Sequence, residues 1–136
     1  MCIRDRDYRE AQEYFKKFVR LNPAAGEGYY YLGVIAEKKP DINSAIGFYR
    51  KAVKFSSEHI FAHYNLGTLY AQRADKRAVR HFKKTLKIKP DYAPAHYNLG
   101  LFYLSNGEPK RAYQSIQRAR NLGYDIPDQV QNIFGE

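Results

Sequence analysis

The sequence has few of the residues that would staple a small protein covalently or carry it through a membrane. It contains one cysteine in 136 residues, which excludes an internal disulfide and therefore a disulfide-framed secreted module. No apolar run approaches the roughly 20 residues of a membrane span. The first six residues also lack the apolar core of a secretory signal. Tryptophan is absent, whereas tyrosine occurs thirteen times.

The composition is that of a folded, basic protein. Hydrophobic residues make up 44% of the chain and aromatic residues 15%, which argues against disorder. The length fits one domain that can bury a core without a metal or disulfide. Lysine and arginine exceed aspartate and glutamate by 23 to 14, for a net charge of +9. This charge raises nucleic acid or an acidic surface as a partner.

Internal repetition indicates the fold. The hexapeptide Ala-His-Tyr-Asn-Leu-Gly occurs at 62–67 and again 33 residues later at 95–100, and a third Leu-Gly pair stands at 32–33. Each pair is followed by a small residue and, four positions later, by a large one. The small residues are Ala45, Ala78 and Ala112, and the large ones are Tyr49, Phe82 and Ile116. The period of 33 to 34 residues is typical of a helical repeat protein.

Each repeat is predicted to form two helices. Tyr29, Leu32 and Ala36 follow helical spacing, and so do Ala45, Tyr49 and Ala52. A segment with a proline and cap-type residues, 38–43, separates the two stripes. Glycine or alanine at matched positions allows two helices to approach closely, which explains why Gly33, Gly67 and Gly100 recur at one phase. The sequence therefore predicts an all-α fold.

The pattern resembles the tetratricopeptide repeat, a 34-residue helix pair with Leu-Gly, tyrosine, alanine, an aromatic residue and proline at set positions. Residues 60–92 match best, through Leu66, Gly67, Tyr70, Ala78, Phe82 and Pro90. This sequence departs from the family pattern at Thr85, Pro40 and Tyr124. The resemblance implies a right-handed α-solenoid of antiparallel helix pairs. It would consist of a partial repeat at 8–25 and full repeats at 26–59, 60–92 and 93–126.

The two ends differ in character. Residues 1–6 match nothing in the pattern and resemble translated adaptor sequence from environmental sequencing, so we expect a helix end and loop there. We assign residues 1–7 to a leader outside the repeats and expect a natural start other than Met1. A genuine, divergent N-terminal cap is the alternative. An uncapped repeat end would favour self-association. At the other end, residues 127–136 are predicted to form a covering helix with Val130, Ile133 and Phe134 on one stripe.

We find no convergent set of catalytic groups and expect a protein that is not an enzyme and needs no cofactor. The serines lie in no nucleophile turn, and no glycine-rich loop precedes a helix. His59 and His63 are four residues apart, as metal ligands on a helix can be, but His59 falls before the predicted helix. His63 and His96 occupy equivalent positions and are better interpreted as packing residues. No metal site is expected.

A basic stripe occupies one face of the predicted helix near residue 80. It consists of Arg77, Arg80, Lys84 and Lys87, spaced 3, 4 and 3 residues apart. In the family the second helix of a pair forms the outer, convex side, so the simplest interpretation is a solvated face. A docking surface for RNA, anionic lipid or an acidic protein is the alternative. Because tyrosines and cations are predicted on opposite faces, nucleic acid is the less favoured partner.

The first helices of the pairs are implied to line the concave side. Tyrosine recurs there at one phase and asparagine beside it, which suits contact with an extended peptide, since an amide both donates and accepts. Similar asparagine ladders hold peptides in members of this family. We expect a peptide-binding groove of Tyr30, Tyr64, Asn65, Thr68, Tyr97, Asn98 and Leu101. In the alternative, the tyrosines pack between repeats and the asparagines satisfy neighbouring backbone.

The sequence thus predicts a non-catalytic scaffold that binds a protein or an extended peptide in its concave groove. Two alternatives stay open: a targeting arm of a larger enzyme such as a glycosyltransferase, and binding of RNA or an acidic surface through the basic stripe. The lack of a secretory signal favours a cytoplasmic location slightly, provided that the natural start is present.

Overall fold

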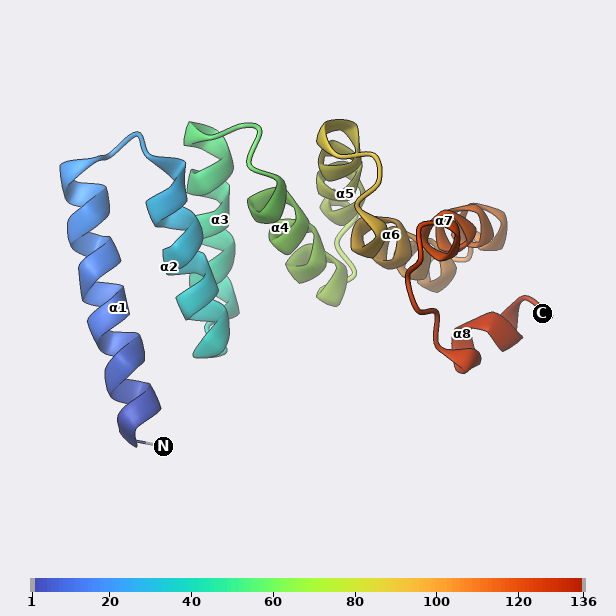
Figure 1. Cartoon of the computed structure of the whole chain (residues 1–136), viewed down its shortest axis with the longest axis horizontal. Coiled ribbons are helices and arrows are strands. Elements are labelled where there is room, and N and C mark those ends of the chain that lie inside the picture. The colour runs from blue at the N-terminus through green and yellow to red at the C-terminus, as the bar shows by residue number, and fades with distance from the viewer. Residues whose placement is uncertain (1, 136) are drawn as a thin grey trace. The chain divides into compact units, whose positions relative to one another are not determined.

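A computed structural model of the protein describes residues 2–135, with side chains from Asp5 to Gly135. Within that range all regular structure is α-helical (Figure 1). The helices are α1 (Cys2–Leu21), α2 (Gly26–Lys38), α3 (Ile42–Phe55), α4 (Ile60–Gln72), α5 (Arg77–Ile88), α6 (Ala93–Ser105), α7 (Pro109–Asn121) and α8 (Asp128–Ile133). α2, α4 and α6 begin at the first residues of the three expected full repeats.

The chain divides into two compact units, and the division falls inside α4. The first unit extends to Leu66 and contains α1, α2, α3 and the first half of α4. The second starts at Gly67 and contains the rest of the chain. In the first unit α2 packs on both α1 and α3, and in the second α6 packs on both α5 and α7. The fold is therefore all-α, with helices packed in adjacent pairs, as the sequence predicts.

The recurring glycines lie where two helices of a pair are closest. A Cβ atom placed on Gly33 would lie 2.5 Å from Cε1 of Tyr49, and one on Gly67 would lie 2.9 Å from Cδ1 of Phe82. The same placement on Gly100 gives 2.6 Å to Cγ1 of Ile116. Since carbon atoms repel strongly at such distances, each glycine allows the large side chain of the second helix to lie directly on its backbone.

Small residues complete the packing on the second helix of each pair. Ala45, Ala78 and Ala112 are fully buried, as the repeat pattern predicts. Thr85, a departure from the family pattern, is also fully buried, and its hydroxyl donates to the carbonyl of His81 at 3.0 Å. This bond satisfies a polar group that would otherwise be costly in the core.

The loops between paired helices reverse direction at equivalent residues with positive φ. These are Pro40, Ala74 and Gly107, with φ values of 23°, 55° and 75°. Only glycine adopts this region without steric cost, so the third loop has the residue that the geometry favours and the first two do not. The same hydrogen bond closes all three loops. In each, a backbone N–H donates to the carbonyl five residues earlier, and the donors are Asp41, Asp75 and Glu108.

The N-terminal segment corrects one expectation. A helix end and loop were expected over residues 1–6, but α1 is continuous from Cys2, so for residues 2–6 the expected loop is wrong. α1 is anchored at its other end, where Phe18 and Val19 lie against Gly28 of α2. It leaves Tyr14 and Leu21 exposed, and self-association through this end stays a prediction.

At the C-terminus, α8 lies against the end of the last pair. Val130 and Phe134 pack on the cluster formed by Ile116, Ala119 and Ile126. Ile133 was expected on the same stripe, but its side chain is 56% exposed, so that assignment is wrong. The helix ends at Ile133, so Phe134 reaches the cluster from the residue that follows the last helical one.

The glycine contacts can be tested with two identical substitutions in helix interiors. Gly67→Ala should lower the free energy of unfolding by about 1–2 kcal/mol, because overpacking against Phe82 outweighs the better helix propensity of alanine. Gly47→Ala in α3 is the matched control, since a Cβ there meets no atom within 4 Å. It should raise stability by about 0.5–1 kcal/mol. Urea unfolding measures both, and changes of the same sign would contradict the packing role.

The loop geometry predicts a stabilising change. Ala74→Gly should raise the free energy of unfolding by about 0.5–1 kcal/mol, since relief of the left-handed conformation exceeds the added freedom of the unfolded chain. Gly107→Ala, at the equivalent position, should lower it by a similar amount. Thermal unfolding of both variants provides the measurement, and a less stable Ala74→Gly would show that the turn does not require this backbone conformation.

Candidate functional site

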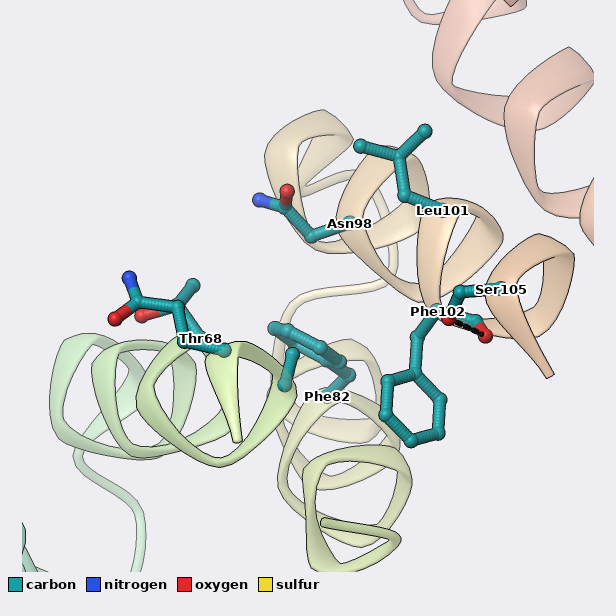
Figure 2. A pocket seen from close by; sticks show the side chains of 8 residues that line it. Thr68, Phe82, Asn98, Leu101, Phe102 and Ser105 are labelled. Carbon is teal, nitrogen blue, oxygen red and sulfur yellow. Dashed lines mark hydrogen bonds between the residues drawn. The ribbon is translucent and has the colours of Figure 1, made fainter. Parts of the chain in front are cut away.

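Three of the residues expected in a peptide groove line one hollow of the second unit. The hollow has a volume of about 270 Å³ and lies between the second half of α4 and α6, above Phe82 of α5 (Figure 2). We call it the amide hollow. Its lining consists of Thr68, Ala71, Gln72, Phe82, Asn98, Leu101, Phe102 and Ser105. Of the expected residues, Thr68, Asn98 and Leu101 are brought together here.

Helical spacing explains why these side chains converge. Thr68 and Gln72 are one turn apart on α4, and Asn98, Leu101 and Ser105 follow spacings of 3 and 4 on α6. Figure 2 shows the Phe82 ring between the two helices, with Phe102 on the far side. The Ser105 hydroxyl donates to the carbonyl of Phe102 at 2.8 Å. The hollow thus combines an aromatic floor with amide and hydroxyl groups at its edges.

Sequence reasoning missed two polar residues of this hollow, Gln72 and Ser105. Both are the last residues of their helices and they are 33 positions apart, so they are equivalent within the repeat. A search for polar residues at the repeat period, continued to the helix ends, would have found them.

Asn65 and Asn98 are equivalent by sequence but differ in their surroundings. The Asn65 amide donates to the hydroxyl of Tyr49 at 3.2 Å. The residue 16 positions before Asn98 is Phe82, which has no hydroxyl to offer. Asn65 therefore bonds to the second helix of the preceding pair, whereas Asn98 lines the amide hollow.

Tyr49 is a fully buried tyrosine with polar partners on both sides. Its hydroxyl donates to the Glu37 carboxylate and accepts from Asn65. Burial, together with the Glu37 carboxylate, raises the pKa of Tyr49 well above its usual range. The ring lies on Gly33, so the hydroxyl is positioned by the same contact that joins α2 to α3.

Two of the three expected groove tyrosines, Tyr30 and Tyr97, make ring contacts within their own units. Tyr30 lies 4.6 Å from the His59 ring, centroid to centroid, and borders a separate hollow of about 470 Å³ in the first unit. Tyr97 lies 4.9 Å from Tyr124, and burial raises the pKa of Tyr97. Tyr64 is half-buried on α4.

Three of the four histidines, His59, His63 and His96, lie near the starts of α4 and α6 and occupy structural positions there. His63 and His96 are buried, and each has a ring nitrogen bonded to the carbonyl six residues earlier, Ser57 at 2.9 Å and Pro90 at 2.8 Å. The Ala62 amide donates to Nδ1 of His59 at 3.1 Å, so the ring proton lies on Nε2, which donates to Glu27. Among the described side chains no group of three potential ligands could hold a metal.

The four cations of the basic stripe differ in their exposure and in their ion pairing. Arg77 pairs with Asp75 at 2.7 Å, and its guanidinium lies 4.4 Å from the Tyr70 ring centroid. This pairing lowers the pKa of Asp75 to about 2 and raises that of Arg77. Lys84 is half-buried, while Arg80 and Lys87 are exposed. In the part of the chain described, no helix is long and apolar enough to cross a bilayer.

Two family models described as Tetratricopeptide repeat match the chain, one over residues 3–59 and one over residues 81–114. The first includes residues 3–7, which sequence reasoning left outside the repeats. A search of curated proteins gave no match.

Solved structures with the same fold include two of MamA. One is 28% identical with a TM-score of 0.79 and matches 85% of this chain and 68% of its own. Another, residues 41 to the end of MamA from Desulfovibrio magneticus RS-1, is 25% identical with a TM-score of 0.80, over 90% and 70% of the two chains.

A third structure is that of YrrB, titled a TPR protein with an unusual peptide-binding site. It is 22% identical with a TM-score of 0.76, over 98% of this chain and 68% of its own. At this identity the likeness shows the fold alone. Across these matches the chain spans 63% to 70% of the length of the solved chains.

The Tyr49 hydroxyl can be tested by its removal. Tyr49→Phe should lower the free energy of unfolding by about 1 kcal/mol, because Asn65 and Glu37 lose a partner. Tyr14→Phe, at an exposed position, is the control and should change nothing.

The same variant has a pH signature. Since folding raises the pKa of Tyr49 above its usual 10.0, its contribution to stability is complete below that pH and is lost as the pH rises further. Urea unfolding between neutral and alkaline pH should therefore show a steeper loss for the wild type than for Tyr49→Phe. Parallel pH profiles would contradict this role.

Proposed function

The chain belongs to the tetratricopeptide repeat family, and we propose that it is a non-catalytic interaction scaffold that holds an extended peptide of a partner protein in the amide hollow. Proteins with this fold and family are generally non-catalytic, which supports a scaffold rather than an enzyme. The proposal concerns this chain's own residues in the second unit, around Asn98.

The observation that supports it is the difference between the two equivalent asparagines. Asn65 bonds to Tyr49, whereas the position equivalent to Tyr49 is occupied by Phe82, so the two asparagines have different surroundings and Asn98 lines the amide hollow. An asparagine amide at the edge of a hollow can donate to and accept from a peptide backbone at once. Gln72 adds a second amide from the opposite helix.

The floor of the hollow supports the same proposal. Phe82 and Phe102 form a buried base, with 0% and 4% of their surface exposed, and the partly exposed Ala71 and Leu101 provide the apolar surface between the polar edges. A peptide side chain that lies over this floor would remove apolar surface from water, while the edges bind its backbone. Backbone bonds then supply affinity for an extended segment, and the floor selects an apolar side chain.

The remaining groove candidates receive a different role in this proposal. Tyr30 and Tyr97 already contact rings of their own units, and Asn65 has Tyr49 as a partner. These three contacts favour packing between repeats, the alternative interpretation of the ladder. Tyr64 remains a candidate for peptide contact.

The proposal can be tested with peptides selected from a phage-displayed library of random extended sequences. Asn98→Ala should weaken binding of a selected peptide about ten-fold, because a backbone group of the peptide loses its amide partner. Asn132→Ala, exposed on α8, is the matched control and should leave the dissociation constant unchanged. Calorimetric titration gives the dissociation constants of both variants, and equal dissociation constants would contradict the proposed site.

A second variant tests the comparison of the asparagines directly. Phe82→Tyr gives Asn98 a hydroxyl partner of the kind that Asn65 has in Tyr49, so it should weaken peptide binding without lowering the unfolding temperature. Unchanged affinity in a folded Phe82→Tyr protein would show that Asn98 does not contact the peptide.

A further inference from the structure

We propose that the outer face of α3 binds single-stranded nucleic acid, at a site in the first unit that is separate from the amide hollow. The site consists of Arg50, Lys51 and Lys54 around Gly47, with the rings of Tyr29 and Phe55 beside them. We call it the outer patch. It replaces the α5 stripe, on which the sequence placed its basic surface, as the nucleic-acid candidate.

The three cations surround a depression. Gly47, Arg50, Lys51 and Lys54 line a hollow of about 430 Å³. Residues 47, 50, 51 and 54 fall on one face by helical spacing, while Ala45, Tyr49 and Ala52 are buried on the other. Gly47 keeps the centre open, since a Cβ there would meet no atom within 4 Å. A narrow anion such as a phosphodiester can therefore approach the helix backbone between the cationic side chains.

These cations carry charge that no acidic side chain neutralises. Among the residues that the structure describes, Arg50, Lys51 and Lys54 have no carboxylate partner. On α5, by contrast, Arg77 is paired with Asp75. The net charge of +9 adds a long-range attraction for polyanions. The pairing thus removes Arg77 from the charge available to an anionic partner on α5, whereas all three cations of the outer patch stay available.

Aromatic rings lie directly beside the cations. The ammonium of Lys51 is 5.6 Å from the Tyr29 ring centroid, and that of Lys54 is 5.5 Å from the Phe55 ring centroid. The two rings stack at 5.6 Å with planes 20° apart, and Phe55 is 41% exposed. The sequence argued against nucleic acid because tyrosines and cations were expected on opposite faces. That expectation concerned the α5 stripe and the groove tyrosines, whereas at α3 a tyrosine ring and a phenylalanine ring lie beside the cations.

The combination distinguishes nucleic acid from other anionic partners. An acidic peptide needs the cations but gains little from the exposed Phe55 ring beside them. Single-stranded nucleic acid uses both, because phosphates bind the cations and bases stack on rings. The charge pattern and the exposed Phe55 ring together therefore favour a single strand.

The experiment measures binding of a fluorescein-labelled oligouridylate of about 12 nucleotides to the whole chain at low salt. The triple variant Arg50→Ala, Lys51→Ala, Lys54→Ala should weaken binding at least ten-fold. It should also lower the slope of log affinity against log salt by about 2, as expected for the loss of three phosphate contacts. Arg80→Ala, Lys83→Ala, Lys87→Ala removes the same charge from exposed positions of α5 and should retain most of the affinity.

Phe55 separates stacking from charge. Phe55→Ala should weaken oligouridylate binding about ten-fold, and Phe55→Tyr should restore it. Peptide binding through Asn98 should persist in every α3 variant, so failure here and failure of the amide hollow can be told apart.

Four outcomes would overturn the proposal. The first two are no oligouridylate binding by the wild type at low salt, and equal losses of affinity in both triple variants, which would indicate net charge alone. The other two are polyglutamate binding as tight as that of oligouridylate through the same residues, and binding to phosphatidylserine vesicles without binding to the oligonucleotide.

Discussion

Every helix pair of this protein depends on one contact, in which a large side chain of the second helix lies on a glycine of the first. Gly33, Gly67 and Gly100 lie so close to Tyr49, Phe82 and Ile116 that a methyl group could not be added without movement of a ring or a branched chain. Such a contact fixes the separation and the rotation of the two helices together. The residues that face outward are then determined by helical spacing from these glycines.

The position of the amide hollow follows from that register. Thr68 comes directly after Gly67, and Leu101 directly after Gly100, so both point away from the buried contact at the same phase. Phe82 serves two roles, since its ring packs on Gly67 and also forms the floor of the hollow. Packing and site are thus built from the same side chain, and a change in the one alters the other.

Much of this architecture could be predicted from the sequence, because a repeated contact leaves a repeated pattern. The starts of α2, α4 and α6 and the buried Ala45, Ala78 and Ala112 follow from the period of 33 to 34 residues. Features that occur once leave no such pattern. The continuation of α1 to Cys2, the exposure of Ile133 and the cations around Gly47 depend on local packing, which periodicity does not encode.

A departure from the repeat is more informative about function than the repeat itself. The tyrosine hydroxyl at position 49 is absent from the equivalent Phe82 and Ile116, and this single oxygen engages Asn65 and Glu37. Two asparagines in identical hexapeptides therefore have different neighbours, because the residue 16 positions earlier differs. The same reasoning applies to charge: α3 and α5 are equivalent helices, but Arg77 of α5 pairs with Asp75 of the preceding loop, whereas the α3 cations have no carboxylate partner among the described residues. Within a repeat protein, equivalent residues with different neighbours can therefore present different surfaces to another molecule.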